Sequence, residues 1–217
     1  MTYLAIEQED TVRATAAVVA AIAPSDGAAR PLCASLQAQA EAVVAAAVLG
    51  TRWGEIVDSL AADGATIDRL ELALDRLVAV TASTDDAASA RTVAEMACLV
   101  ALAAAVPDEA LRSLDDAEAL IARVADRFAR VEDAIADVDD GAHWRALANL
   151  QAAVASYLST ATTALPRRRS VALAAPEPAL TVAQRLYQDA ARGDELATEN
   201  AVIHPAFMPL ALTALTS

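Results

Sequence analysis

The sequence predicts a mainly α-helical protein, in which an alanine-rich helical bundle with long antiparallel helices precedes a small strand–helix–helix–strand module. Hydrophobic residues make up 56% of the chain and aromatic residues only 3%, so the apolar residues are mostly Ala, Leu and Val. Alanine has the highest helix propensity and buries little area, which favours long, closely packed helices. Prolines and turn residues interrupt this pattern near the C-terminus. The expected domains are a helical bundle over residues 1–165 and a small module over residues 166–217.

Five alanine-rich helices are expected before residue 107. The breaks between them carry residues typical of loops, such as the run Pro24–Gly27. Pro31 fits the first turn of the second helix, and Thr66 fits the N-cap of the fourth. The expected helices cover residues 9–23, 31–50, 51–62, 67–77 and 86–105.

The strongest periodicity follows in residues 113–141. Apolar residues alternate steps of three and four over more than three heptads, which predicts a helix packed along its whole length. Ser113 is a suitable N-cap, and Gly141 is expected to end the helix. The apolar seam consists of Leu114, Ala117, Ile121, Val124, Phe128, Val131, Ile135 and Val138.

A second long helix is expected over residues 143–164. Only a short glycine-containing link separates it from the heptad helix, so the two should form an antiparallel hairpin. Its predicted inner face consists of Trp144, Leu147, Val154, Leu158 and Leu165.

The first half of the C-terminal module is expected to contain a strand and a short helix. Residues 170–173 follow a basic run and alternate polar and apolar, as a short strand does. Pro176 and Pro178 exclude helix around themselves. Thr181 is then expected to cap a two-turn helix.

The second half of the module is expected to contain another short helix followed by another extended segment. Gly193 interrupts the helical pattern, and Asp194 and Glu195 suit the first turn of another short helix. That helix should end at Asn200, and residues 203–215 should return as an extended segment.

The charge of the chain argues against binding to nucleic acid. The formal net charge is −14, and every strong base is Arg. A chain this acidic is soluble and is repelled by phosphate backbones. The acidic N-terminus does not resemble a signal peptide, and apolar runs of about ten residues are too short to span a membrane.

Two alternatives concern cysteine and arginine side chains. Cys33 and Cys98 lie inside apolar helical patterns, so buried thiols are favoured over a disulfide. Arg123, Arg127 and Arg130 line one side of the heptad helix, where neutralising neighbouring carboxylates is favoured over contacting a partner.

The sequence gives no indication of an enzyme, a cofactor or a metal site. His143 and His204 are the only histidines and lie far apart, and no His or Cys pair has metal-ligand spacing. The paired aspartates sit at helix ends or in loops, where solvated caps are favoured over acid–base catalysis. No Walker pattern or nucleophile elbow is present.

Residues 179–209 resemble the C-terminal signature of the Mu-like phage DNA circulation (circularisation) protein family. Members carry a Leu-Ala-x-Arg-Leu-Tyr-Gly-Asp type run, an acidic-Glu-Leu/Ile stretch, an Asn and an Ile-x-His-Pro-x-Phe segment. Upstream segments with a similar sequence pattern extend the resemblance to residues 90–210. The matching residues are Arg185, Leu186, Tyr187, Asp189, Asp194, Glu195, Leu196, Asn200, Ile203, His204, Pro205 and Phe207.

The resemblance implies a structural protein of a contractile phage tail, acting as an adaptor at the junction of tail tube and baseplate. The terminal module is similar to LysM modules, which implies shape-determining roles for Tyr187, Asp189 and Asn200. The implied partners are tube, hub and wedge proteins, with several copies per particle and localisation in the virion. The expected partner-binding residues are Arg167, Arg168, Arg169, Arg185, Tyr187, Asp189, Asp194, Asn200, His204 and Phe207.

The chain departs from the family in three ways. No part of this sequence is expected to form the family's usual β-rich N-terminal domain, Gln188 stands where the family has Gly, and no Gly-Gly follows Phe207. Protein docking is therefore favoured over the alternative, a LysM-type module that binds peptidoglycan and helps the tail engage the cell wall. A cytoplasmic helical scaffold is a third possibility.

The basic run Arg167–Arg169 has two open interpretations. It would either contact phosphate or an acidic partner, or flank a strand and discourage aggregation.

Overall fold

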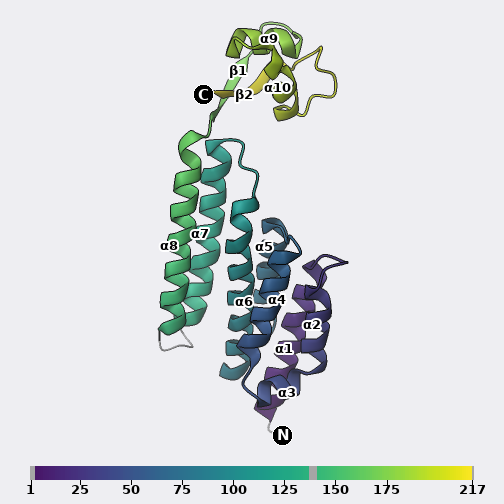
Figure 1. The fold of residues 1–217 in the computed structure, drawn as a ribbon, viewed down its shortest axis with the longest axis vertical. Helices are drawn as coiled ribbons and strands as arrows, with labels where there is room; N and C mark the ends of the chain where they lie inside the picture. Colours follow the sequence, from purple (N-terminus) through teal and green to yellow (C-terminus); the bar gives the residue numbers. More distant parts are fainter. Residues whose placement is uncertain (1–2, 137–140, 217) are drawn as a thin grey trace. The chain divides into compact units, whose positions relative to one another are not determined.

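The computed structural model describes residues 3–136 and 141–216 and is mainly helical, with a two-stranded antiparallel sheet near the C-terminus (Figure 1). This confirms the predicted mainly helical class. The chain divides into two compact units. The first comprises residues 1–109 and 122–156, and the second comprises residues 110–121 and 157–217. The second unit thus holds the entire predicted C-terminal module and the adjoining ends of two long helices.

The first unit is organised around α6, which packs against α1, α4 and α5. Leu99 and Leu102 of α6 are fully buried, as is Leu70 of α5. The first six helices are α1 (Tyr3–Ile22), α2 (Ala29–Ala38), α3 (Ala40–Ala45), α4 (Leu49–Ala62), α5 (Ile67–Val78) and α6 (Asp85–Ala105).

The helix α6 is apolar enough to be compared with a membrane span. Together with the 3-10 turn η1 (Val106–Asp108) it meets the length and composition of one, with a mean hydropathy of 1.5. However, 61% of that apolar window is buried inside the protein. The core helix of a soluble fold meets the same criteria, so this helix is weak evidence for a membrane.

The predicted single helix over residues 31–50 is wrong. Gln39 has φ −106° and ψ 14°, which separates α2 from α3, and Ala47 has a left-handed φ of 53°. Gly50 lies inside α4 and does not end a helix. Alanine-rich sequence offers no periodic signal at such breaks, because alanine fits a helix and its flanks equally well.

The heptad helix is α7 (Leu114–Ala136), and it forms an antiparallel pair with α8 (Ala142–Ala161) (Figure 1). Five of the predicted seam residues are buried, and Leu114 and Ile121 are half-buried; Val138 lies outside the described residues. The buried members are Ala117, Val124, Phe128, Val131 and Ile135.

The predicted inner face of α8 is partly wrong. Leu147, Val154 and Leu158 are buried, but Trp144 is 46% exposed. Leu165 is half-buried beyond the 3-10 turn η2 (Thr162–Ala164).

The predicted N-caps differ in their hydrogen bonds. Ser113 and Asp116 form a capping box, in which each side chain accepts from the other residue's backbone N–H at 3.1 Å. Thr66 stands at the expected position before α5, but its side chain makes no capping hydrogen bond.

Cys33 and Cys98 are buried free thiols, as expected. Burial raises the pKa of Cys33 to about 11 and that of Cys98 to about 12. Both behave as small apolar side chains of the core.

The arginines of α7 neutralise carboxylates, as expected. Arg127 binds both carboxylate oxygens of Asp75 in α5. The guanidinium nitrogen Nη1 of Arg123 lies 3.4 Å from the carboxylate oxygen Oδ1 of Asp68, which also belongs to α5. Arg130 pairs with Asp126 at 2.8 Å.

Candidate functional site

The C-terminal module is built on a two-stranded sheet and two short helices. Strand β1 (Arg167–Ala172) pairs antiparallel with β2 (Ala211–Thr216), in the register Arg168 to Leu215. Between the strands lie α9 (Ala179–Tyr187), the 3-10 turn η3 (Ala190–Arg192) and α10 (Gly193–Glu199). A small apolar core joins helices and sheet: Leu173, Ala179, Val182, Leu196, Ala197, Met208, Leu212 and Ala214.

Three predicted boundaries in this module are wrong. The strand expected at residues 170–173 begins at Arg167, and the second extended segment begins at Ala211 instead of residue 203. Helix α9 begins at Ala179, because Pro178 with φ −62° and ψ 143° serves as its N-cap instead of Thr181. The basic run therefore lies within a strand, where alternation places Arg168 on the opposite face from Arg167 and Arg169.

Gly193 begins α10 and does not interrupt a helix. A Cβ at this position would lie 3.0–3.2 Å from atoms of Leu180 in α9. Glycine therefore suits this position, because a Cβ would force Leu180 to shift by a few tenths of an ångström where the backbones of α9 and α10 approach closely.

Asn200 connects the end of α10 to β2. Its amide nitrogen donates to the carbonyl oxygens of Leu196 and Thr213, both at 2.8 Å. Its amide oxygen accepts from the backbone N–H of Thr213 at 2.7 Å. All three bonds are internal, so the amide group holds the module together and is already occupied.

Tyr187 has a similar structural position at the end of α9. Its hydroxyl oxygen accepts from the backbone N–H of Leu215 at 3.1 Å, and burial raises its pKa. The guanidinium of Arg192 lies 3.9 Å from the centre of the ring, where it makes a cation–π contact. Glu195 fixes Arg192 through two hydrogen bonds of 2.7 and 2.9 Å, which lower the pKa of that carboxyl.

Arg168 is the most connected cation of the module. Its Nε donates to Glu199 at 2.6 Å and its Nη1 donates to Asp116 of α7 at 2.6 Å. Its backbone N–H donates to Asp115 at 2.8 Å. The hydrogen bond to Glu199 is the largest contribution to the raised pKa of Arg168. We call Arg168, Glu199, Asp115 and Asp116 the arginine clamp.

The arginine clamp ties the sheet to the beginning of α7. The backbone N–H of Leu114 also donates to the carbonyl of Pro166 at 2.8 Å. Burial works to raise the pKa of Asp116, but hydrogen bonds from Ser113 and Arg168 outweigh it and lower the pKa overall. The module is therefore bound to the N-terminal residues of α7 that belong to the second unit.

The other predicted polar site residues lie on the surface. Arg167 is 3.6 Å from Glu118, and Arg185 pairs with Glu177 at 3.1 Å; both guanidinium groups are largely exposed. Asp189 accepts from the backbone N–H of Ala191 at 2.9 Å and so begins η3. Arg169 and Asp194 are exposed.

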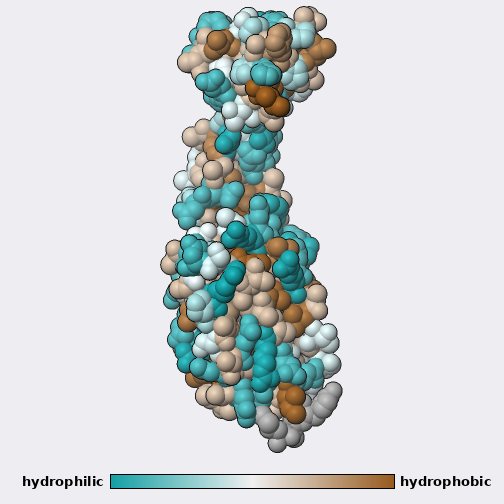
Figure 2. All heavy atoms as spheres, turned by 90° about the vertical axis from the view of Figure 1, so that its right-hand side faces the viewer, coloured by the Kyte–Doolittle hydropathy of each residue, from teal (hydrophilic) through white to brown (hydrophobic). Residues whose placement is uncertain are grey.

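The segment between α10 and β2, residues 201–210, presents apolar side chains to solvent. Ile203 is 88% exposed and Phe207 is 71% exposed, and His204 between them is exposed as well. In the second unit, Figure 2 shows hydrophobic residues at the surface among polar ones. We call residues 203–207 the apolar loop.

Backbone hydrogen bonds hold the apolar loop on both sides. The N–H of Ala179 donates to the carbonyl of Pro205 at 2.6 Å, and the N–H of Met208 donates to that of Glu177 at 2.9 Å. Within the loop, the N–H of Phe207 donates to the carbonyl of His204 at 3.0 Å. Its two large apolar side chains are consequently exposed on a fixed backbone.

The sequence analysis missed two groups of partners, one of which a local rule could have indicated. The pairing of Arg168 with Glu199 and Asp116 joins residues far apart in the chain, and no local pattern reports it. The pair Arg192–Glu195 has i,i+3 spacing, so helix side-chain rules would have indicated it.

The described part of the chain offers no arrangement for metal chemistry. No group of three or more His, Cys, Asp or Glu side chains in residues 3–136 and 141–216 is placed to hold a metal ion. No protein-family model matches the sequence, and no curated protein matches it significantly.

Proposed function

We propose that this chain is a non-enzymatic structural protein of a phage tail, an adaptor at the junction of tail tube and baseplate. In this role the C-terminal module docks onto tube, hub or wedge proteins, and the helical unit packs against neighbouring subunits in an assembly with several copies. Residues 179–209, which resemble the phage DNA circulation protein family, support this proposal.

The exposed side chains of the apolar loop are the observation that best supports the docking role. Large apolar side chains on a fixed backbone bind a partner without paying to order a flexible segment. Phe207 and Ile203 have the exposure of anchor residues that fill a pocket on another protein. Meanwhile the amide group of Asn200 and the hydroxyl of Tyr187 are engaged inside the module.

The order β1, α9, α10, β2 is similar to that of LysM modules, which supports a LysM-like adaptor. Gln188 has a φ of 60°, the left-handed conformation that glycine adopts freely. The backbone at this position therefore has the shape that the glycine of the family would give it, at some cost in strain.

The experiment is a pull-down with the protein products of the genes that flank this one. The double substitution Ile203→Ser with Phe207→Ser removes the apolar loop's anchors without touching the module core. We expect the variant to lose more than about tenfold in affinity for a tail protein. Leu72→Ser on α5, which replaces an exposed apolar residue outside the module, is the control and should bind normally.

Three outcomes would contradict the adaptor role. The first is normal binding by the double variant, and the second is no binding of any flanking-gene product by the native chain. The third is retention of the native chain on insoluble peptidoglycan, which would favour the glycan-binding alternative.

A further inference from the structure

We propose that the first unit binds an amphipathic α-helix of another protein, with Lys or Arg along its flanks, in a groove formed by α4, α6 and α8. This inference does not depend on the role of the C-terminal module, because every residue that carries it belongs to the first unit.

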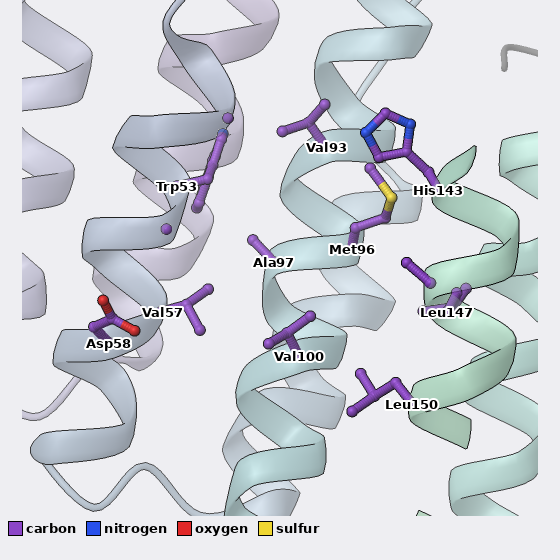
Figure 3. A pocket seen from close by; sticks show the side chains of 13 residues that line it. Trp53, Val57, Asp58, Val93, Met96, Ala97, Val100, His143, Leu147 and Leu150 are labelled. Carbon is purple, nitrogen blue, oxygen red and sulfur yellow. The ribbon is translucent and has the colours of Figure 1, made fainter. Parts of the chain in front are cut away.

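The groove is apolar and open. It has a volume of about 440 Å³, and half-buried or exposed aliphatic side chains from all three helices converge on it (Figure 3). Val57 comes from α4, Met96 and Val100 from α6, and Leu150 from α8. Val100 is 41% exposed, so the floor of the groove lacks a cover in the free chain.

The groove and a second, separate hollow together extend over the length of a short helix. A smaller hollow of about 100 Å³ follows on the next turn of the same two helices, with Ala61 of α4 and Ala104 of α6 among its lining residues. The lining residues of α6 and η1 thus run from Val93 to Asp108. At the helical rise this is about 23 Å, which matches a helix of about fifteen residues.

Two glycines on one wall allow a close approach by a partner. Gly50 and Gly54 lie one turn apart inside α4, and a Cβ at either position would contact nothing within 4 Å. A glycine inside a helix costs about 0.5–1 kcal/mol relative to alanine. No contact within residues 3–136 and 141–216 explains this cost, whereas a helix packed against α4 would use the flat surface.

The charges around the groove favour a basic partner. Asp58, Asp108 and Glu109 are exposed lining residues of the two hollows. None of these three carboxylates has an ion pair or side-chain hydrogen bond within the described residues. A helix with an apolar stripe flanked by Lys or Arg would complement both the floor and the rim.

A buried donor at the groove also lacks an acceptor. Trp53 projects from α4 toward α6 at the groove (Figure 3), is 2% exposed, and its indole N–H makes no hydrogen bond in the described chain. A buried donor without an acceptor is unfavourable. Because this nitrogen is itself buried, a partner's oxygen would reach it only if the Trp53 side chain turned toward the groove.

The test uses three labelled fifteen-residue peptides and the full chain. The first has a leucine stripe at helical spacing with Lys on its flanks, the second has Glu in place of Lys, and the third is a scramble of the first. Fluorescence anisotropy should show binding of the Lys peptide, at least about tenfold weaker binding of the Glu peptide, and none of the scramble.

Two single substitutions test where the peptide binds, and a double substitution tests the role of the carboxylates. Gly54→Leu fills the edge of the groove and should abolish binding of the Lys peptide, whereas Ala17→Leu, at an exposed position of α1, should leave it unchanged. Asp58→Asn combined with Glu109→Gln should weaken binding and reduce its dependence on salt.

The proposal is overturned if the Lys peptide does not bind, if the scramble binds equally, or if Gly54→Leu and Ala17→Leu behave alike. It is also overturned if the free chain self-associates and Gly54→Leu makes it monomeric, since the occupant would then be a second copy.

Discussion

At the scale of single residues, the C-terminal module separates polar side chains that build it from apolar ones that it presents. Asn200 and Tyr187 satisfy backbone groups of β2, which would otherwise be buried without partners. Ile203 and Phe207 contribute little to the core and remain exposed. This division is why sequence motifs alone do not tell contact residues from structural ones.

Asn200→Ala should destabilise the second unit by about 2 kcal/mol or more, because it removes three hydrogen bonds and leaves the Thr213 backbone unpaired. Hydrogen exchange of the Thr213 and Leu215 amides should become correspondingly faster. Asn149→Ala, at an exposed position of α8, is the matched control and should change nothing. Unaltered exchange in the Asn200 variant would refute the structural role.

The thiols should be unreactive in the native chain. With pKa values of about 11 and 12, Cys33 and Cys98 would be thiolate in only about one molecule in a thousand or fewer at pH 8. Iodoacetamide at pH 8 should label neither cysteine until urea unfolds the chain. Rapid labelling of either one under native conditions would show that the core is open there.

At the scale of elements, ion pairs connect neighbouring helices of the first unit, whereas the glycines of one helix leave part of its surface uncontacted. The guanidinium groups of α7 face carboxylates of α5, with Arg127 binding both oxygens of Asp75. The pKa of Asp75 is lowered, chiefly by this hydrogen bond. For Gly50 and Gly54 of α4, in contrast, an added Cβ would have no atom of the described residues within 4 Å.

Arg127→Met should change how stability depends on pH. A carboxyl whose pKa is lowered on folding contributes stability that is complete above its unfolded pKa of about 3.9 and is lost as pH falls through the folded pKa. The variant should therefore lose less stability than the native chain between pH 5 and pH 3, by up to about 1 kcal/mol. Urea unfolding at both pH values measures this difference.

The control for that measurement is Arg69→Met, since Arg69 is an exposed arginine of α5. No carboxylate among the described residues forms an ion pair with Arg69, so its variant should keep the native pH dependence. Identical pH dependence in both variants and the native chain would contradict the role of the Asp75 pair.

Gly54→Ala should stabilise the first unit by about 0.5–1 kcal/mol, because alanine favours the helix and its Cβ would have no atom of the described residues within 4 Å. Gly64→Ala should have the opposite effect by about 1 kcal/mol, because Gly64 has a left-handed φ of 68°. Thermal unfolding of the two variants measures both changes. Destabilisation by Gly54→Ala would show that α4 is packed more tightly than the structure has it.

At the scale of the whole molecule, the sequence predicts the helical class because periodicity and alanine content are distributed over many residues. The seam of α7 was found in this way. Single positions were predicted less well: Trp144 is exposed although its spacing fits the inner face of α8, and Pro178 caps α9 in place of Thr181.

The candidate site could be located from the sequence but not resolved into roles. The apolar loop lies within the run that resembles the phage family, but the sequence predicts an extended segment over residues 203–215 and no exposed loop. The arginine clamp is not predicted either, because Arg168, Glu199 and Asp116 meet only through the pairing of β1 with β2 and the start of α7. Contacts between distant segments leave no periodic signal in a single sequence.

The adaptor role is tested most directly by photo-cross-linking in assembled phage particles. A photoreactive phenylalanine analogue at position 207 should cross-link this chain to a tail-tube or baseplate protein, because Phe207 is exposed on the apolar loop. The same analogue at Leu72 of α5 serves as the comparison for an exposed position outside the module. Particles that lack this chain, or that give no cross-link from position 207 to another virion protein, would contradict the account.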